Sequence, residues 1–168
     1  MNRVTSRALP EHALLFDFRG KGDYADCFTI DVAGKISLHQ FVGAFYTSWL
    51  FKVERLLLRW LVAKPSTDQQ AEQLAAGMVD NFAAWTVEGR LQDQLLLCDY
   101  QGRTRSWLMV EPITSAPGAH SRLYFGSGVV SVTGKKTGFP VMPLTFRLML
   151  GFHRYYSRAL LRSAAANL

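Results

Sequence analysis

The stretch PLTFRLMLGFHRYYSRALLRSAAAN, residues 143–167, decides the fold class of this chain. Its apolar residues recur at helical spacing and its arginines lie opposite them, a division typical of an amphipathic helix with one buried face. The apolar side carries Phe146, Met149, Leu150, His153, Tyr156, Leu160 and Leu161, and the polar side carries Arg147, Arg154, Arg158 and Arg162. Strand-like segments precede this helix. Helix and sheet would each have a face to bury, which predicts an α+β domain.

Two or three helices are expected between the first strand and the later ones. Ser37, with Gln40 three residues later, makes a capping-box pattern at the start of the first helix. Thr47 and Ser48 should interrupt the helical run, because their hydroxyl groups compete for backbone hydrogen bonds. A second helix should then run from Trp49 to about residue 62. Its expected core face is Trp49, Val53, Leu56, Leu57, Trp60 and Leu61.

Five segments have the alternation and composition of strands. They cover residues 23–32, 82–90, 93–100, 103–112 and 121–133. Gln101 and Gly102 are expected to form a hairpin turn between two of them, and Ser66 or Thr67 should cap a short helix over 68–76. The prediction is a curved antiparallel sheet packed on the long C-terminal helix, with two or three shorter helices after the first strand.

Length and composition predict a single domain over residues 1–168, in which residues 1–20 form an irregular N-terminal segment. Hydrophobic residues make up 49% of the chain and charged residues 19%, as in an ordinary globular protein. The N-terminus lacks the apolar stretch of a signal peptide. With only two cysteines, Cys27 and Cys98, we expect reduced thiols and a cytoplasmic location.

Several strings of the chain resemble bacterial proteins of the DUF2867 type, a family without an assigned function that is grouped with the START and Bet v 1 helix-grip proteins. The strings are FYTSW (45–49), LLCD (96–99), GRTRSWL (102–108), LYFGS (123–127) and GFHRYYS (151–157). The resemblance covers about residues 20–165 and implies a sheet that wraps around the C-terminal helix. Such domains have six or seven strands. The five expected here imply a cavity that is smaller, more open or absent.

The favoured function is non-enzymatic binding of a small apolar or amphipathic ligand between sheet and C-terminal helix, without a cofactor. Sites of this kind are mostly apolar, with a few polar groups. The expected lining is Arg105, Trp107, Tyr124, Met149, His153 and Tyr156. An alternative is a cyclase- or hydratase-like enzyme in which His153 is the candidate catalytic acid or base. A core histidine held by one hydrogen bond is the commoner role, and it weighs against an enzyme.

A second alternative follows from the net charge of +6 and the arginine stripe of the last helix. The chain would then be an interaction protein that contacts anionic surfaces, including a membrane periphery. Nucleic-acid binding is not expected, because the basic residues form no run of five or six. No metal site is expected either, since the four histidines lie far apart and no HxxxH or CxxC occurs.

Overall fold

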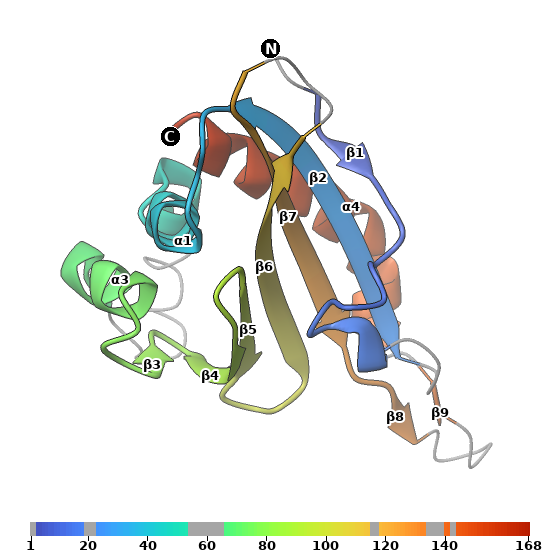
Figure 1. Cartoon of the computed structure of the whole chain (residues 1–168). Coiled ribbons are helices and arrows are strands. Elements are labelled where there is room, and N and C mark those ends of the chain that lie inside the picture. The colour runs from blue at the N-terminus through green and yellow to red at the C-terminus, as the bar shows by residue number, and fades with distance from the viewer. Residues whose placement is uncertain (1–2, 19–22, 54–65, 115–117, 134–139, 142–143) are drawn as a thin grey trace.

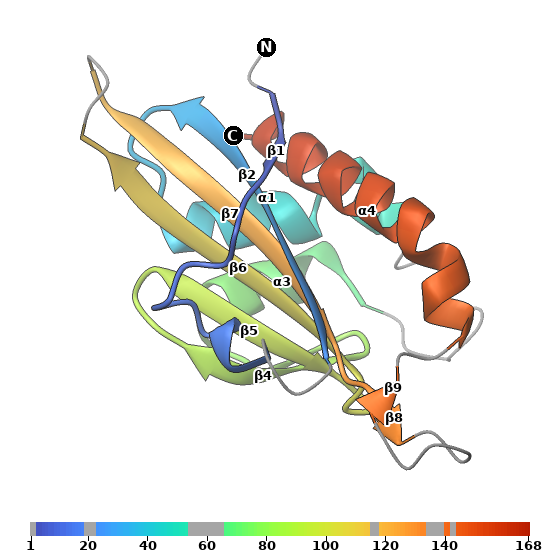
Figure 2. The same ribbon diagram turned by 90° about the vertical axis from the view of Figure 1, so that its right-hand side faces the viewer.

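The computed structural model of the protein describes residues 3–18, 23–53, 66–114, 118–133, 140–141 and 144–168. It consists of a curved antiparallel sheet with helices on one face and the N-terminal segment on the other (Figures 1 and 2). The long helix α4 (Leu144–Ala165) packs on the same face as the shorter α1 (Leu38–Tyr46). The predicted α+β fold, with a sheet packed on a long C-terminal helix, is confirmed.

In the described part of the chain, seven strands form the main sheet, and every neighbouring pair is antiparallel. In spatial order they are β1 (Thr5–Ser6), β2 (Tyr24–Ala33), β7 (His120–Val129), β6 (Thr104–Ile113), β5 (Gln94–Asp99), β4 (Trp85–Arg90) and β3 (Asn81–Phe82). The expected count of five strands is wrong. The two-residue β1 was missed, and the segment 82–90 divides into β3 and β4 at a turn where Ala83 has a φ of 52°.

Two of the strands have no place in this sheet: β8 (Val132–Thr133) and β9 (Pro140–Val141) pair with each other. The sequence joins the β8 residues to β7 as one strand over 121–133. In the structure β7 ends at Val129, and the Val130 N–H donates to the Arg103 carbonyl at 2.8 Å. The chain thus leaves the main sheet at the end of β7.

Both predicted caps and the predicted helix break are confirmed. Ser37 caps α1, and Thr67 caps α3 (Asp68–Ala75), each within a complete capping box. At the end of α1, the Thr47 hydroxyl donates to the Gly43 carbonyl at 2.8 Å, and the Ser48 hydroxyl accepts from the Phe51 N–H at 3.3 Å. The Thr47 hydroxyl shares the Gly43 carbonyl with the Thr47 N–H, and the Ser48 hydroxyl takes the place of a backbone acceptor for the Phe51 N–H, as expected of hydroxyl side chains in a helix.

The expected core face of the next helical stretch is wrong where the structure describes it. Residues 49–53 are helical, but Trp49 is 67% exposed and Val53 is 48% exposed. Phe51 is buried instead, and Leu50 packs partly against the core. The interruption at Ser48 turns the helix, so the apolar stripe no longer continues that of α1. Leu56, Leu57, Trp60 and Leu61 lie outside the described residues.

The sheet is apolar on both faces, because side chains alternate along each strand. On the inner face, Leu97, Leu108 and Phe125 pack with residues of α1, α3 and α4. On the outer face, Trp107 and Met109 pack with residues of the N-terminal segment. The sheet therefore separates two cores, of which the sequence pattern predicted only the inner one.

The N-terminal segment, residues 3–18, is the cover of the outer face. It contains β1 and a short 3-10 helix, η1 (Phe16–Phe18), and it buries Leu9, Ala13 and Leu15. The buried Gln94 fastens it to the sheet: its Oε1 accepts from the Leu14 N–H at 2.9 Å, and its Nε2 donates to the His12 carbonyl at 3.0 Å.

Candidate functional site

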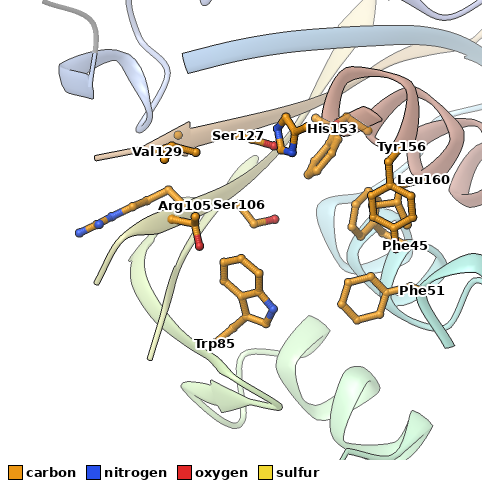
Figure 3. A pocket seen from close by; sticks show the side chains of 14 residues that line it. Phe45, Phe51, Trp85, Arg105, Ser106, Ser127, Val129, His153, Tyr156 and Leu160 are labelled. Atoms are coloured by element: carbon orange, nitrogen blue, oxygen red, sulfur yellow. The ribbon is translucent and has the colours of Figure 1, made fainter. Parts of the chain in front are cut away.

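A cavity of about 200 Å³ lies between the sheet and α4, where β6 begins and β7 ends. Figure 3 shows its polar and apolar sides. The polar side carries Ser106, Ser127 and His153, and the apolar side carries Phe45, Phe51, Tyr156 and Leu160, with Trp85 across from His153. An amphipathic molecule would find complementary groups on the two sides.

The break after α1 builds the apolar side. Phe45 lies before the break and Phe51 after it, and their ring centroids are 6.0 Å apart. Phe45 also packs against Phe125 of β7, at 4.8 Å between centroids. An uninterrupted helix would place residues six apart on different faces, at 100° per residue. The interruption brings both rings to the same wall.

The polar side rests on a shielded carboxylate. Asp26 of β2, whose side chain is 9% exposed, accepts from the Ser127 N–H and from the Tyr24 hydroxyl, both at 2.9 Å. His153 Nε2 lies 3.5 Å from Asp26 Oδ2, and the Tyr24 ring meets the imidazole edge-on. Burial, together with the adjacent Asp26, raises the pKa of the Tyr24 hydroxyl. Tyr24 therefore stays a hydrogen-bond donor to the carboxylate near neutral pH.

A second polar contact comes from the start of β6. The hydroxyl groups of Ser106 and the buried Tyr46 lie 3.3 Å apart. The side chain of Ser106 points inward between the apolar rings and the sheet (Figure 3). Because a hydroxyl group both donates and accepts, Ser106 can satisfy either kind of polar atom on a ligand.

Some of the predicted site residues line the cavity, and others do not. His153 and Tyr156 line the cavity from α4. Arg105 also borders it, but its guanidinium points away (Figure 3) and holds the Glu88 carboxylate through two bonds, at 2.9 and 2.8 Å. These bonds lower the pKa of Glu88, so Arg105 already has its anionic partner. Met149 belongs to α4, but its side chain lies outside the described residues.

Trp107 and Tyr124 lie on the outer face of the sheet, so their expected place beside α4 is corrected. Trp107 is fully buried under the N-terminal segment, and its indole N–H donates to Gln94 Oε1 at 2.9 Å. The Tyr124 hydroxyl donates to Glu111, and burial followed by this contact raises the pKa of Tyr124 to about 12. The cause of the error is the alternation of β6 and β7, where the neighbouring residues face the helices.

Sequence reasoning missed most of the cavity wall. Ser106 lies between the predicted site residues Arg105 and Trp107, and Ser127 lies three residues after Tyr124, so both serines are on the other parity of their strands. In the register, Ser106 pairs with Ser127 across β6 and β7. Two serines within otherwise apolar strands are a usable signal, since a polar residue on a buried face needs a partner or a ligand.

Searches of protein-family models, curated proteins and solved structures found no match to this chain. Within the described residues, no group of three His, Cys, Asp or Glu side chains is arranged to hold a metal ion. No helix in the same part of the chain combines the length and apolar character needed to cross a membrane.

Proposed function

We propose that the protein binds a small amphipathic ligand, with one ring and one polar substituent, in the cavity between the sheet and α4. The observation that carries this proposal is the division of the cavity into an aromatic side and a polar side. A mostly apolar pocket with few polar groups is the usual form of a small-molecule site. The resemblance to helix-grip proteins of the DUF2867 type is part of the proposal, supported by the order of the elements.

The volume restricts the size of the ligand. An apolar cavity of roughly 150 Å³ holds one benzene molecule, and drug-sized ligands occupy roughly 300–1,000 Å³. The cavity of about 200 Å³ therefore has room for a single ring with a short substituent. The ring would lie against Phe45 and Phe51, and the substituent would reach Ser106 or Ser127. We further propose a cytoplasmic location, which the free thiols of Cys27 and Cys98 support.

The test uses two substitutions at one position of the polar side. Ser127→Ala keeps the space and removes the hydroxyl group, whereas Ser127→Leu fills the space. Calorimetric titration with benzyl alcohol and with toluene should show that the alcohol binds wild-type protein more tightly. Ser127→Ala should lower the affinity for the alcohol several-fold, which corresponds to the loss of about one hydrogen bond, and it should leave the affinity for toluene unchanged. Ser127→Leu should abolish both. Equal binding to all three proteins would place the ligand elsewhere and refute the proposal.

His153 supplies an independent check. If the cavity is the binding site, His153→Ala should lower the affinity for the alcohol and cause only a modest loss of stability. Thermal melts with and without ligand separate the two effects, since a ligand that binds the folded state raises the melting temperature. A melt that drops by the same amount in both conditions would leave His153 a structural role only.

One observation favours a second candidate, an acid–base enzyme of the cyclase or hydratase kind. His153 borders the cavity with a shielded carboxylate 3.5 Å from its Nε2, an arrangement that can orient an imidazole for proton transfer. Binding and turnover distinguish the candidates. If the protein is an enzyme, Asp26→Asn should leave ligand binding largely intact and abolish conversion of the ligand to product. Ligands that bind wild-type protein but emerge unchanged after prolonged incubation would favour the binding protein.

A further inference from the structure

The last third of the chain contains no acidic residue. Residues 112–168 carry seven Lys or Arg side chains and no Asp or Glu, so the excess positive charge of the protein is concentrated there. Three of the seven, Arg154, Arg158 and Arg162, are exposed on α4. In the part of the chain that the structure describes, no ion pair joins them to a carboxylate. Arg158 also lies over the Phe28 ring, at 5.2 Å.

Aromatic side chains stand between these arginines. Phe152 is 62% exposed and Tyr155 is 74% exposed, although large apolar side chains usually avoid such positions. Helical spacing places Tyr155, Arg158 and Arg162 along one exposed stripe, because residues three and four apart are neighbours. Figure 2 shows α4 along the outside of the molecule. We name Phe152, Arg154, Tyr155, Arg158 and Arg162 the outer face of α4.

We propose that the outer face of α4 docks on the surface of an anionic lipid bilayer. Arginines and aromatic rings on one exposed helix face are the composition of interfacial helices, in which the rings enter the headgroup boundary and the cations meet lipid phosphates. The inference goes beyond the proposed ligand site. That site uses other residues of the same helix, His153 and Tyr156.

Two other occupants fit the observations less well. A single-stranded nucleic acid stacks successive bases on a series of aromatic faces, but here Tyr156 covers one face of Phe152, with the rings 10° from parallel, and Tyr155 is the other exposed ring of this face. A second copy of this chain would bring two acid-free arginine faces together, and such like-charge juxtaposition is unfavourable. A bilayer of anionic lipid complements both the charge and the rings.

The test measures co-sedimentation of the full chain with vesicles of phosphatidylcholine alone and with a third of phosphatidylglycerol. The protein is expected to sediment only with the anionic vesicles. The bound fraction should fall steeply between 0.1 M and 1 M salt, because the Debye length shortens from roughly 10 Å to 3 Å. Arg154→Gln with Arg162→Gln should weaken binding about 30-fold, since each arginine near such a surface contributes about fivefold. Phe152→Ser with Tyr155→Ser should also weaken it.

A matched control removes the same charge from the opposite side of the molecule. Arg3 and Arg7 are exposed on the N-terminal segment, and Arg3→Gln with Arg7→Gln should leave vesicle binding within about twofold of wild type. If this control loses as much vesicle binding as the Arg154 and Arg162 variant, net charge alone explains the binding and the proposal is overturned. Tighter binding to a single-stranded oligonucleotide than to vesicles would also overturn it. So would a dimer that dissociates on the Phe152 and Tyr155 substitutions.

Discussion

Gln94→Leu is the substitution that tests most directly how the outer face of the sheet is closed. Gln94 is 2% exposed, and its side chain makes three hydrogen bonds that join β5, β6 and the N-terminal segment. Its Oε1 is the shared acceptor for the Leu14 N–H and the Trp107 indole N–H. The leucine side chain is one atom shorter and offers neither an acceptor nor a donor.

The expected loss follows from the groups left behind. A buried donor without an acceptor costs roughly 1–3 kcal/mol. The Trp107 indole is fully buried and pays this cost in full, whereas the Leu14 N–H is only part-buried and can reach water. We therefore expect Gln94→Leu to lower the free energy of unfolding by about 2–4 kcal/mol in total. For a chain of this size, that corresponds to about 4–15 °C in melting temperature.

Urea titration followed by fluorescence measures the free energy, and timed trypsin digestion reports on the segment itself. If the segment loosens first, cleavage after Arg7 should accelerate more than the loss of global stability explains. Gln92→Leu is the matched control, because Gln92 is exposed two residues away, and it should stay within about 0.5 kcal/mol of wild type. A Gln94→Leu protein as stable as Gln92→Leu would refute the assignment of Gln94 as the fastening residue.

Three further substitutions have expected outcomes. Gly126→Ala should cost about 3 kcal/mol in a urea titration, since its Cβ would lie 2.8 Å from the Asp26 carbonyl oxygen, a contact that backbone cannot easily relieve. Gly151→Ala should instead stabilise the protein by about 0.5–1 kcal/mol, because it is an exposed helical glycine with open space around it. Arg105 lowers the pKa of Glu88, so their pair stabilises the fold above the ordinary pKa of Glu, about 4.3, and this contribution disappears as pH falls through the lower folded value. Melts at a series of pH values should therefore show a shallower acid-side decline for Glu88→Gln than for wild type.

The elements that the sequence predicted well are those defined by local chemistry. The caps of Ser37 and Thr67 and the break at Thr47 and Ser48 depend on side chains that bond to their own neighbouring backbone. Such bonds need no knowledge of the rest of the fold. The long helix also follows from its own periodicity, and for His153 that periodicity predicted the correct side, toward the sheet.

The parts that failed depend on distant residues. The stripe through Trp49 and Val53 has helical spacing, but the turn of the chain after Ser48 decides which side of it meets the core. The face of Trp107 could not be settled either, because β6 is apolar on both parities and alternation alone gives no preference. Only the pairing of β6 with its neighbours, and the position of the helices, fixes the face.

The continuous apolar runs of β5 and β6 contain a signal that explains the site. Runs such as LLLC and WLMV are typical of strands buried on both faces, so the sheet needs a cover on each side. The helices after β2 and at the C-terminus cover one face. The residues before β2 are then the remaining candidate to cover the other face. The outer core then takes Trp107 and Tyr124. The cavity is left on the inner face, where Ser106 and Ser127 replace the apolar residues of the strand centres. The position of the cavity follows from the two serines that interrupt the apolar inner face of β6 and β7, and its aromatic wall follows from the break after α1.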